Sequence, residues 1–260
     1  MQAYGPSFAR VYNRGWSDFA RGVAPLIYGI YVATPSGRAN RPVLDVGCGT
    51  GVLANFFLNK GFRVIGIDLS EEMLRQARED ARPFIASGQA RFIQHDVVDF
   101  QMDERVGLVV ATYDVLSHLE DEHTLRRAFE GIYRICDEMF VFDLSTRLGL
   151  RQWSSIRVDD SSEEAVVISR GSFDEQGGRG WSRLSGFFRT ESGLYERFDQ
   201  TFFNTAHEMV RVRNALLEVG WETVHFARAE DLNTPIQSPE AEHRVFFVAR
   251  KHASSGRDEG

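Results

Sequence analysis

The sequence is short of cysteine, of lysine and of long apolar stretches. Its two cysteines, Cys48 and Cys136, cannot build a disulfide framework, which fits a reducing, cytoplasmic compartment. No apolar run reaches the roughly 18 residues that a membrane-spanning helix needs. Residues 1–10 lack the basic and then apolar pattern of a signal peptide. We therefore expect a cytoplasmic protein without a membrane segment.

Positive charge is also scarce. The formal net charge is -7, whereas a general nucleic-acid binder needs a basic face that displaces counterions from phosphates. This balance excludes nucleic-acid binding and argues against a polyanionic substrate. Lys60 and Lys251 are the lysines, and every other basic residue is an arginine, which is typical of a GC-rich bacterial genome.

The apolar content is sufficient for one large domain with a smaller insert, since 43% of the 260 residues are hydrophobic. Apolar residues recur at helical spacing over residues 1–34, and a run rich in proline and glycine follows at 35–42. Residues 1–40 are therefore expected to form a helical segment of their own. The small, polar residues 252–260 predict a disordered tail.

Short apolar strands alternate with helices over residues 41–146, and residues 207–251 continue this pattern. The expected strands are 43–46, 63–67, 91–95, 106–112, 139–142, 223–226 and 244–249. The expected helices are 50–59, one that Ser70 caps, 121–136 and 208–219. The alternation predicts an α/β fold, a Rossmann-like, doubly wound, seven-stranded sheet that is mostly parallel with an antiparallel last strand.

Residues 147–206 break the alternation. The segments 165–173, 181–189 and 194–203 are rich in aromatic and β-branched residues, and glycine-containing turns separate them. We expect a small antiparallel β insert that binds the acceptor or joins subunits into a homo-oligomer, because such an insert offers sheet edges and apolar surface. Most of its aromatic side chains are expected to form its core: Trp153, Phe173, Trp181, Phe187, Phe188, Tyr195, Phe198, Phe202 and Phe203.

The strongest local pattern is Val43-Leu44-Asp45-Val46-Gly47-Cys48-Gly49-Thr50-Gly51, a strand that runs directly into a glycine-rich turn and a helix. Glycine lets the backbone approach a ligand closely, and ligands of open αβ sheets lie beyond the carboxyl ends of the strands. A nicotinamide dinucleotide site would want its third glycine at position 52, which is Val52. The charge of Asp45 would repel a pyrophosphate but tolerates a cofactor with a cationic sulfonium.

Two further acids end the next two strands. Asp68 stands where an acid accepts hydrogen bonds from both ribose hydroxyls of a nucleoside cofactor. Asp96 can accept from an adenine amino group while the Val97 amide donates to a ring nitrogen. Alone, Asp68 is also compatible with a helix start and Asp96 with a simple turn, but together with the glycine turn both favour a cofactor site.

These segments resemble class I S-adenosylmethionine-dependent methyltransferases. The motifs are Leu44 to Gly51, Gly66 to Leu74 and Asp96-Val97, within a match over residues 40–146 and 207–250. The resemblance implies S-adenosylmethionine as cofactor and S-adenosylhomocysteine as product. The cofactor contacts that it implies lie in these motifs: Asp45, Gly47, Cys48, Gly49, Asp68, Leu69, Met73, Asp96 and Val97. Cys136-Asp137-Glu138 replaces the family's Pro-Gly-Gly turn, which puts that loop in doubt.

The beginning of the chain and the β insert narrow the resemblance. Tyr4-Gly5 and Ala9-Arg10-Val11-Tyr12 are similar to a group of small-molecule methyltransferases that includes aminosugar N,N-dimethyltransferases and lincosamide N-methyltransferases. In that group the N-terminal helices form a lid, and a tyrosine of the lid touches the cofactor. The resemblance implies this role for Tyr12 and, less directly, for Tyr4.

Methyl transfer requires alignment of nucleophile, methyl group and sulfur, exclusion of water, and a base for an amine or hydroxyl proton. Thr112 and Tyr113 follow the fourth strand and are expected to line the methyl tunnel. His118 is the first candidate base, with helix capping or local packing as its alternative. His207 and Glu208 are candidates from the other side, unless they only begin a helix.

Two further patterns are weaker. Asp143 ends the fifth strand and is expected to bind an acceptor hydroxyl or amine, or else to serve the fold alone. The run from His118 to His123 holds two histidines and three acids but lacks the spacing of a helical pair of metal ligands. No metal is expected.

The sequence thus predicts an enzyme that moves a methyl group from S-adenosylmethionine to a nitrogen of a small, sugar-like or amino-acid-derived metabolite, with a role in natural-product or antibiotic biosynthesis. Small-molecule O-methylation is the close alternative. A cofactor-cleaving or cyclising enzyme, and a non-catalytic cofactor-binding sensor, remain open on the same fold.

Overall fold

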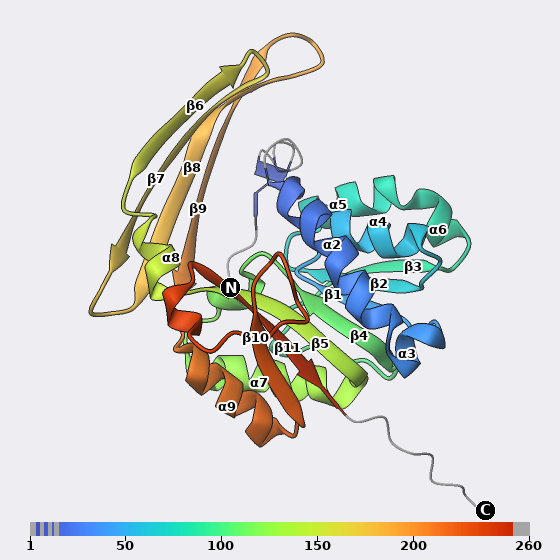
Figure 1. Cartoon of the computed structure of the whole chain (residues 1–260). Coiled ribbons are helices and arrows are strands. Elements are labelled where there is room, and N and C mark those ends of the chain that lie inside the picture. The colour runs from blue at the N-terminus through green and yellow to red at the C-terminus, as the bar shows by residue number, and fades with distance from the viewer. Residues whose placement is uncertain (1–3, 6–7, 10–11, 13–15, 252–260) are drawn as a thin grey trace, which may run out of the picture.

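A mixed seven-stranded sheet in the order β10-β11-β5-β4-β1-β2-β3 lies at the centre of the computed structural model (Figure 1), which describes residues 4–5, 8–9, 12 and 16–251. The strands are β1 (Val43–Val46), β2 (Val64–Asp68), β3 (Ala90–Gln94), β4 (Val106–Ala111), β5 (Cys136–Ser145), β10 (Thr223–Ala227) and β11 (Arg244–Arg250). β11 runs antiparallel to both of its neighbours, and the other strands share one direction. The predicted Rossmann-like fold is confirmed, whereas the predicted tail, 252–260, lies outside the described residues.

Helices cover both faces of this sheet and make two separate cores. One face packs against α2 (Ser17–Val32), α4 (Val52–Asn59) and α5 (Glu71–Asp80), and the other against α7 (Glu122–Ile135) and α9 (Met209–Val219). The shorter helices are α3 (Pro35–Arg38), α6 (Arg82–Ala86), α8 (Arg147–Arg151), η1 (Val115–His118) and η2 (Pro239–Ala241). Among the described residues, no helix has the length and apolarity to cross a membrane.

Helix α2 belongs to the core, although the sequence pattern grouped it with the expected lid. Ile27 and Tyr31 of α2 are fully buried against the same sheet face as α4 and α5. A lid role therefore stays a prediction for the segment before α2, of which Tyr4, Gly5, Phe8, Ala9, Tyr12 and Trp16 are described.

The structure describes two segments that the sequence left open. In the run 35–42, Pro35 opens the four-residue helix α3, and the hydroxyl of Thr34 accepts a hydrogen bond from the Gly37 amide at 3.1 Å. The doubtful loop at Cys136 is absent, since β5 begins directly where α7 ends. The Lys251 ammonium donates to the Cys136 carbonyl at 2.7 Å and closes this junction.

The insert is a four-stranded antiparallel sheet that stands beside the main domain as a curved blade (Figure 1). Its strands are β6 (Ile156–Ser162), β7 (Ala165–Asp174), β8 (Arg179–Arg189) and β9 (Tyr195–Thr205), in that order across the sheet. The sequence predicted β7, β8 and β9 but missed β6, whose second half, Asp159 to Ser162, is entirely polar and whose residues are all exposed.

The two faces of the insert differ in burial. Phe173, Phe188 and Phe198 are buried on the face toward the main domain, where Met73 and Phe8 join them. The expectation that most insert aromatics form its core is wrong, because three of the nine are buried, Trp153 and Phe202 are half-buried, and the other four are exposed on the outward face: Trp181, Phe187, Tyr195 and Phe203. The main domain covers only one face of this single sheet. Because successive side chains of a strand point to opposite faces, every second residue lies on the uncovered face.

Candidate active site

The glycine turn after β1 is built for close approach of a ligand. Gly47 and Gly49 have φ angles of +64° and +54°, which side-chain-bearing residues rarely adopt. A Cβ atom at Gly47 would lie 2.4 Å from a methyl group of Val115, so only glycine fits there. A Cβ at Gly49 would meet the Tyr12 ring at 3.8 Å, which places Tyr12 over the turn.

Asp68, at the end of β2, is fixed beside this turn. One carboxylate oxygen accepts from the Gly49 amide at 2.9 Å and the other from the Ser70 amide at 2.8 Å. Each oxygen has a second acceptor position, so the carboxylate can still receive two ligand hydroxyls. Burial raises the pKa of Asp68, and its backbone hydrogen bonds oppose that shift.

Asp45 lies behind the turn and is 2% exposed. Its Oδ2 atom has no hydrogen-bond partner among the described residues. Burial, followed by the neighbouring charge of Asp68, raises the pKa of Asp45 to about 8. A cation bound nearby would lower this pKa again and favour the ionised carboxyl, and S-adenosylmethionine carries such charges on its sulfonium and ammonium groups.

A narrow cavity of about 60 Å³ lies over the glycine turn and is called the cofactor cavity below. Its lining is Tyr4, Tyr12, Val46, Gly47, Gly49, Ile67, Asp68, Leu69, His95, Val97, Thr112, Tyr113, Val115 and His118. The N-terminal segment covers it, because the Tyr4 carbonyl accepts from the Ser70 hydroxyl at 2.7 Å and the Gly5 amide donates to Gln200 of β9 at 3.0 Å. This segment therefore bridges the main domain and the insert.

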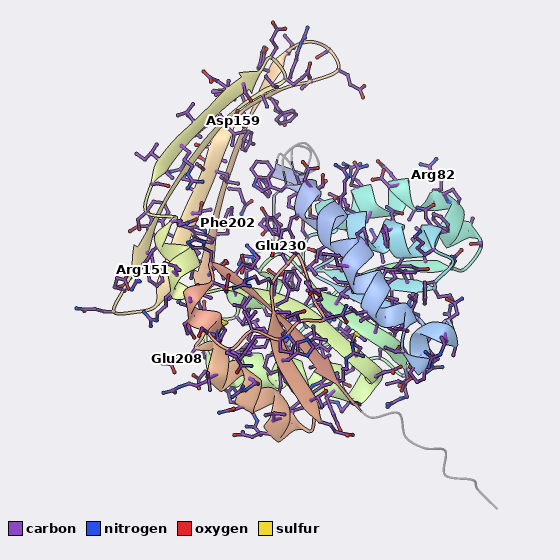
Figure 2. All side chains as sticks on the ribbon, in the orientation of Figure 1. Arg82, Arg151, Asp159, Phe202, Glu208 and Glu230 are labelled. Atoms are coloured by element: carbon purple, nitrogen blue, oxygen red, sulfur yellow. The ribbon has the colours of Figure 1, made fainter. Side chains whose placement is uncertain are left out.

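A second cavity, of about 420 Å³, lies between the insert and the carboxyl edge of the main sheet and is called the acceptor cavity below. Polar groups lining it include Ser145, Gln152, Ser155, Arg157, Ser169, Ser182, Asn204, His243 and Arg244. Aromatic rings add Trp16, Trp153 and Phe202, and Figure 2 shows Phe202 on the side of β9 that faces the main domain. Its volume is within the range of about 300–1,000 Å³ that is typical of small-molecule sites.

His118 lies where the two cavities meet, and it lines both together with Tyr4, Tyr12 and Tyr113. Its Nδ1 atom is 2.8 Å from the Phe203 carbonyl. Because a carbonyl only accepts, Nδ1 carries the hydrogen, and the Nε2 lone pair accepts a hydrogen bond from the Tyr4 hydroxyl at 3.4 Å. Burial lowers the pKa of His118, so the imidazole is neutral at pH 7 and can accept a proton.

Comparison with known proteins agrees with this geometry. A family described as a methyltransferase domain matches residues 43–138. The chain is 29% identical over 225 residues to a protein of Geobacillus sp. (strain WCH70) that is assigned as a methyltransferase, covering 80% of this chain and 84% of that protein. It is 30% identical over 129 residues to the ubiquinone biosynthesis O-methyltransferase of Escherichia coli O127:H6, covering 47% of this chain and 51% of that enzyme.

Solved structures show the same fold over almost the whole chain. An S-adenosylmethionine-dependent methyltransferase from Clostridium acetobutylicum superimposes with a TM-score of 0.76 at 20% identity, covering 94% of this chain and 97% of that one. The sugar N-methyltransferase KedS8 from Streptoalloteichus superimposes with a TM-score of 0.73 at 19% identity, covering 96% of both chains. This chain thus carries a methyltransferase domain at residues 43–138, within the fold of a solved S-adenosylmethionine-dependent methyltransferase, and is an enzyme.

In the methyltransferase, most residues expected to touch the cofactor gather at the cofactor cavity. Tyr12, Gly47, Gly49, Asp68, Leu69, Val97 and Thr112 line it. Asp45, Cys48, Met73 and Asp96 do not. Cys48 packs below the turn, where its sulfur would lie 2.9 Å from a Cβ at Gly66, and Met73 is buried against the insert. Asp96 accepts from the Val98 amide at 2.9 Å and so ends the strand as a local cap.

The structure does not bring the other candidate acceptor groups into the acceptor cavity of the methyltransferase. His207 is 5% exposed and lines neither cavity, because it is buried against Leu119 at the start of α9. Figure 2 shows Glu208 on the outer surface, where it accepts from Arg211 at 2.8 Å. Asp143 is fully buried, and backbone amides and Arg244 occupy its oxygens.

Sequence reasoning missed Arg157, Asn204 and Arg244, which line the acceptor cavity. They come from β6, β9 and β11, and only strand pairing brings them together. Asn204 is 2% exposed, and its Oδ1 has no partner among the described residues. In the described part of the methyltransferase, no three Asp, Glu, His or Cys side chains group as ligands for one metal ion, and the expectation of a metal-free enzyme stays a prediction.

Proposed function

We propose that the methyltransferase transfers the methyl group of S-adenosylmethionine to a nitrogen atom of a small, polar metabolite. One observation carries this proposal: neutral His118, whose Nε2 lone pair accepts a long hydrogen bond from the Tyr4 hydroxyl, lies at the junction of the cofactor cavity and the acceptor cavity. An amine is protonated at neutral pH and must lose a proton before its lone pair can attack. A neutral imidazole at this junction suits that step.

The remaining groups hold and align. S-adenosylmethionine supplies a methyl group that its positive sulfur activates for displacement. Asp68 would hold the ribose and the glycine turn the amino-acid part, since their free acceptor and backbone groups fit these partners. Tyr4, Tyr12 and Tyr113 line both cavities and would exclude water from the reacting atoms.

The lining of the acceptor cavity supports a sugar-like acceptor. Hydroxyl groups of Ser155, Ser169 and Ser182 lie beside the guanidinium of Arg157 and the amide of Asn204. Such a wall offers many hydrogen bonds to a polyhydroxylated or amino-bearing molecule. The similarity of fold to the sugar N-methyltransferase KedS8 is consistent with a role in natural-product biosynthesis.

O-methylation of a small molecule is the second candidate, and the 30% identity to an O-methyltransferase over 129 residues favours it. His118 could equally take a hydroxyl proton as attack proceeds. The two candidates differ only in the acceptor atom.

Product analysis separates the candidates. The enzyme is incubated with S-adenosylmethionine and matched pairs of acceptors, each an amino sugar or amino acid derivative and the analogue with hydroxyl in place of amine, and products are identified by mass spectrometry. We expect a methylated amine and S-adenosylhomocysteine. Methylation of the hydroxyl analogue alone would establish O-transfer, and methylthioadenosine would indicate cofactor cleavage instead.

A further inference from the structure

Two consecutive residues at the carboxyl end of β4 adopt left-handed backbone conformations without being glycine. Tyr113 has a φ angle of +69° and Asp114 one of +63°. This region is sterically unfavourable for side-chain-bearing residues and persists only where surrounding contacts hold it. Tyr113 lines both cavities, and Asp114 begins the turn of 3-10 helix η1 that ends at His118.

Two buried carboxylates hold this bend from opposite sides. Asp143 of β5 accepts from the Tyr113 amide at 2.5 Å and from the Asp114 amide at 3.1 Å. The carboxylate of Asp114 accepts from the Ser145 amide at 2.6 Å, from the Ser145 hydroxyl at 2.8 Å and from the Ser117 hydroxyl at 3.0 Å. The amides of the bend and the start of η1 are thus tied to β5.

Arg244 joins the two carboxylates. One guanidinium nitrogen donates to Asp143 and the other to Asp114, the latter at 2.5 Å. The guanidinium carbon also lies 5.3 Å from the centre of the Tyr113 ring and 4.9 Å from that of Phe19. The Phe19 and Tyr113 rings stack at 4.8 Å, so Arg244 and Phe19 fix the ring of Tyr113 as well as its backbone.

The antiparallel direction of β11 makes this contact possible. Arg244 is the first residue of β11 and pairs with Ser145, the last residue of β5. A parallel strand in the same place would deliver its last residue to the carboxyl edge of the sheet. β11, which runs antiparallel to its neighbours, therefore begins at the carboxyl edge of the sheet. Its first side chain, Arg244, contacts both carboxylates there.

We propose that Asp114, Asp143 and Arg244 form a positioning clamp that fixes Tyr113 and His118 at the junction of the two cavities. The clamp rests on the proposed function, because it presents His118 to the acceptor and Tyr113 to the methyl path. Asp114 and Arg244 line the acceptor cavity as well, but in the clamp all three are positioning residues, which act through the bend and η1. The hydrogen bonds to the bend, to Ser145 and to Ser117 occupy the oxygens of Asp114 and Asp143. These carboxylates are therefore not the bases of the proposed reaction.

The experiment removes the guanidinium and restores the charge. Arg244→Met keeps the length of the side chain but leaves two neighbouring carboxylates buried without a cation. Arg244→Lys restores a charge that can reach one carboxylate at a time, because an ammonium lacks the planar fork of arginine. Arg228→Met is the matched control, since Arg228 forms an exposed ion pair with Glu242 and lines neither cavity.

Three quantities are measured at a temperature where circular dichroism shows each variant folded: kcat, the Kd of S-adenosylhomocysteine, and amide hydrogen exchange. Because a displacement of about 1 Å at a reacting group can cost 100-fold in rate, we expect Arg244→Met to lower kcat by about 30-fold or more. The Kd should stay within about 3-fold, since Asp68 and the glycine turn are untouched, so kcat and binding separate. Arg244→Lys should recover part of the loss, and Arg228→Met should resemble the unmodified enzyme.

Hydrogen exchange tests the clamp without relying on methyl transfer. In Arg244→Met the amides of residues 113–118 should lose protection, while those of 47–51 keep it. Unchanged protection of 113–118 would overturn the clamp whatever the enzyme methylates, and so would a kcat within about 3-fold of the unmodified enzyme. If Arg244→Met does not fold, Asp143→Asn, which keeps the shape and one acceptor oxygen, is judged by the same outcomes.

Discussion

At the scale of single residues, position rather than chemistry decides which histidine can act. His118 and His207 are both largely buried, and burial lowers the pKa of each. Both are therefore neutral at pH 7, and each is hydrogen-bonded to the backbone, His118 to Phe203 and His207 to Leu119. Of these two histidines, His118 lines both the cofactor cavity and the acceptor cavity, and His207 lines neither. A shifted pKa alone would not have distinguished the two.

We expect His118→Ala to lower turnover by about 100-fold, the usual contribution of a general base, with cofactor affinity nearly intact. The pH dependence has a definite sign. Protonation removes the Nε2 lone pair, and burial lowers the pKa below its ordinary 6.5, so activity should be complete above pH 6.5 and fall on the acid side of it. The pH profile of kcat/KM checks this, with the exposed His123→Ala as control. A loss below 5-fold would leave alignment alone as the source of catalysis.

Asp68 carries the second prediction at this scale. Asp68→Ala should weaken binding of S-adenosylhomocysteine by roughly 1.5–3 kcal/mol, because two charge-assisted hydrogen bonds to ribose hydroxyls are lost. Titration calorimetry measures the change. Asp80→Ala is the control. Asp80 is an exposed aspartate at the end of α5, away from the cofactor cavity, and its loss should leave the affinity unchanged. Equal affinity of a folded Asp68→Ala protein would place the ribose elsewhere.

At the scale of elements, the sequence predicted what local patterns determine. The strands β1, β2 and β4 are apolar runs followed by turn residues, and the glycine turn with Asp68 marks the cofactor end of the sheet. The sequence could not predict which face of the insert sheet packs against the main domain. Alternating side chains define two faces but do not show which of them is covered. Arg244 and Asn204 escaped for a related reason: they reach the site through strand pairing with partners about a hundred and about twenty residues away.

The N-terminal segment offers the third prediction. Tyr12 lies over Gly49 and lines the cofactor cavity, and Tyr4 and Gly5 of the same segment contact the main domain and the insert. We therefore expect the segment before α2 to open when the cofactor enters. Amides near Tyr12 should become better protected from exchange when S-adenosylhomocysteine is added. Tyr12→Phe keeps the ring and should weaken binding by about 1 kcal/mol, the net value of one hydrogen bond. Identical protection with and without ligand would mark a static flank.

At the scale of the whole molecule, the insert divides two tasks between its faces. Its inward face carries serines, Asn204 and Phe202 to the acceptor cavity. Its outward face holds large apolar side chains with high exposure: Ile156 at 76%, Val158 at 60%, Phe187 at 48%, Phe203 at 46% and Trp181 at 37%. Strand register confirms that they share one face, because Trp181 pairs with Phe203 and Val158 with Ile168. The ion pairs of Asp199 with Arg183 and Arg197 lie among these side chains on the same face. Exposed apolar side chains in this number are typical of an interface.

We expect a second copy of the chain to cover this outward face. A two-fold axis places the same apolar patch on itself, and two such sheets can pack face to face as a sandwich about 10 Å thick. Sedimentation velocity should therefore give the mass of a dimer. Phe187→Glu should give monomers, because it would replace an apolar contact by a carboxylate from each copy that must leave water on pairing. Leu217→Glu is the control, since Leu217 is 42% exposed on α9, away from the insert, and should leave the dimer unchanged.

A monomeric unmodified protein at high concentration would contradict self-association. If Phe187→Glu is monomeric and still binds S-adenosylhomocysteine, the outward face serves assembly while the inward face serves the acceptor.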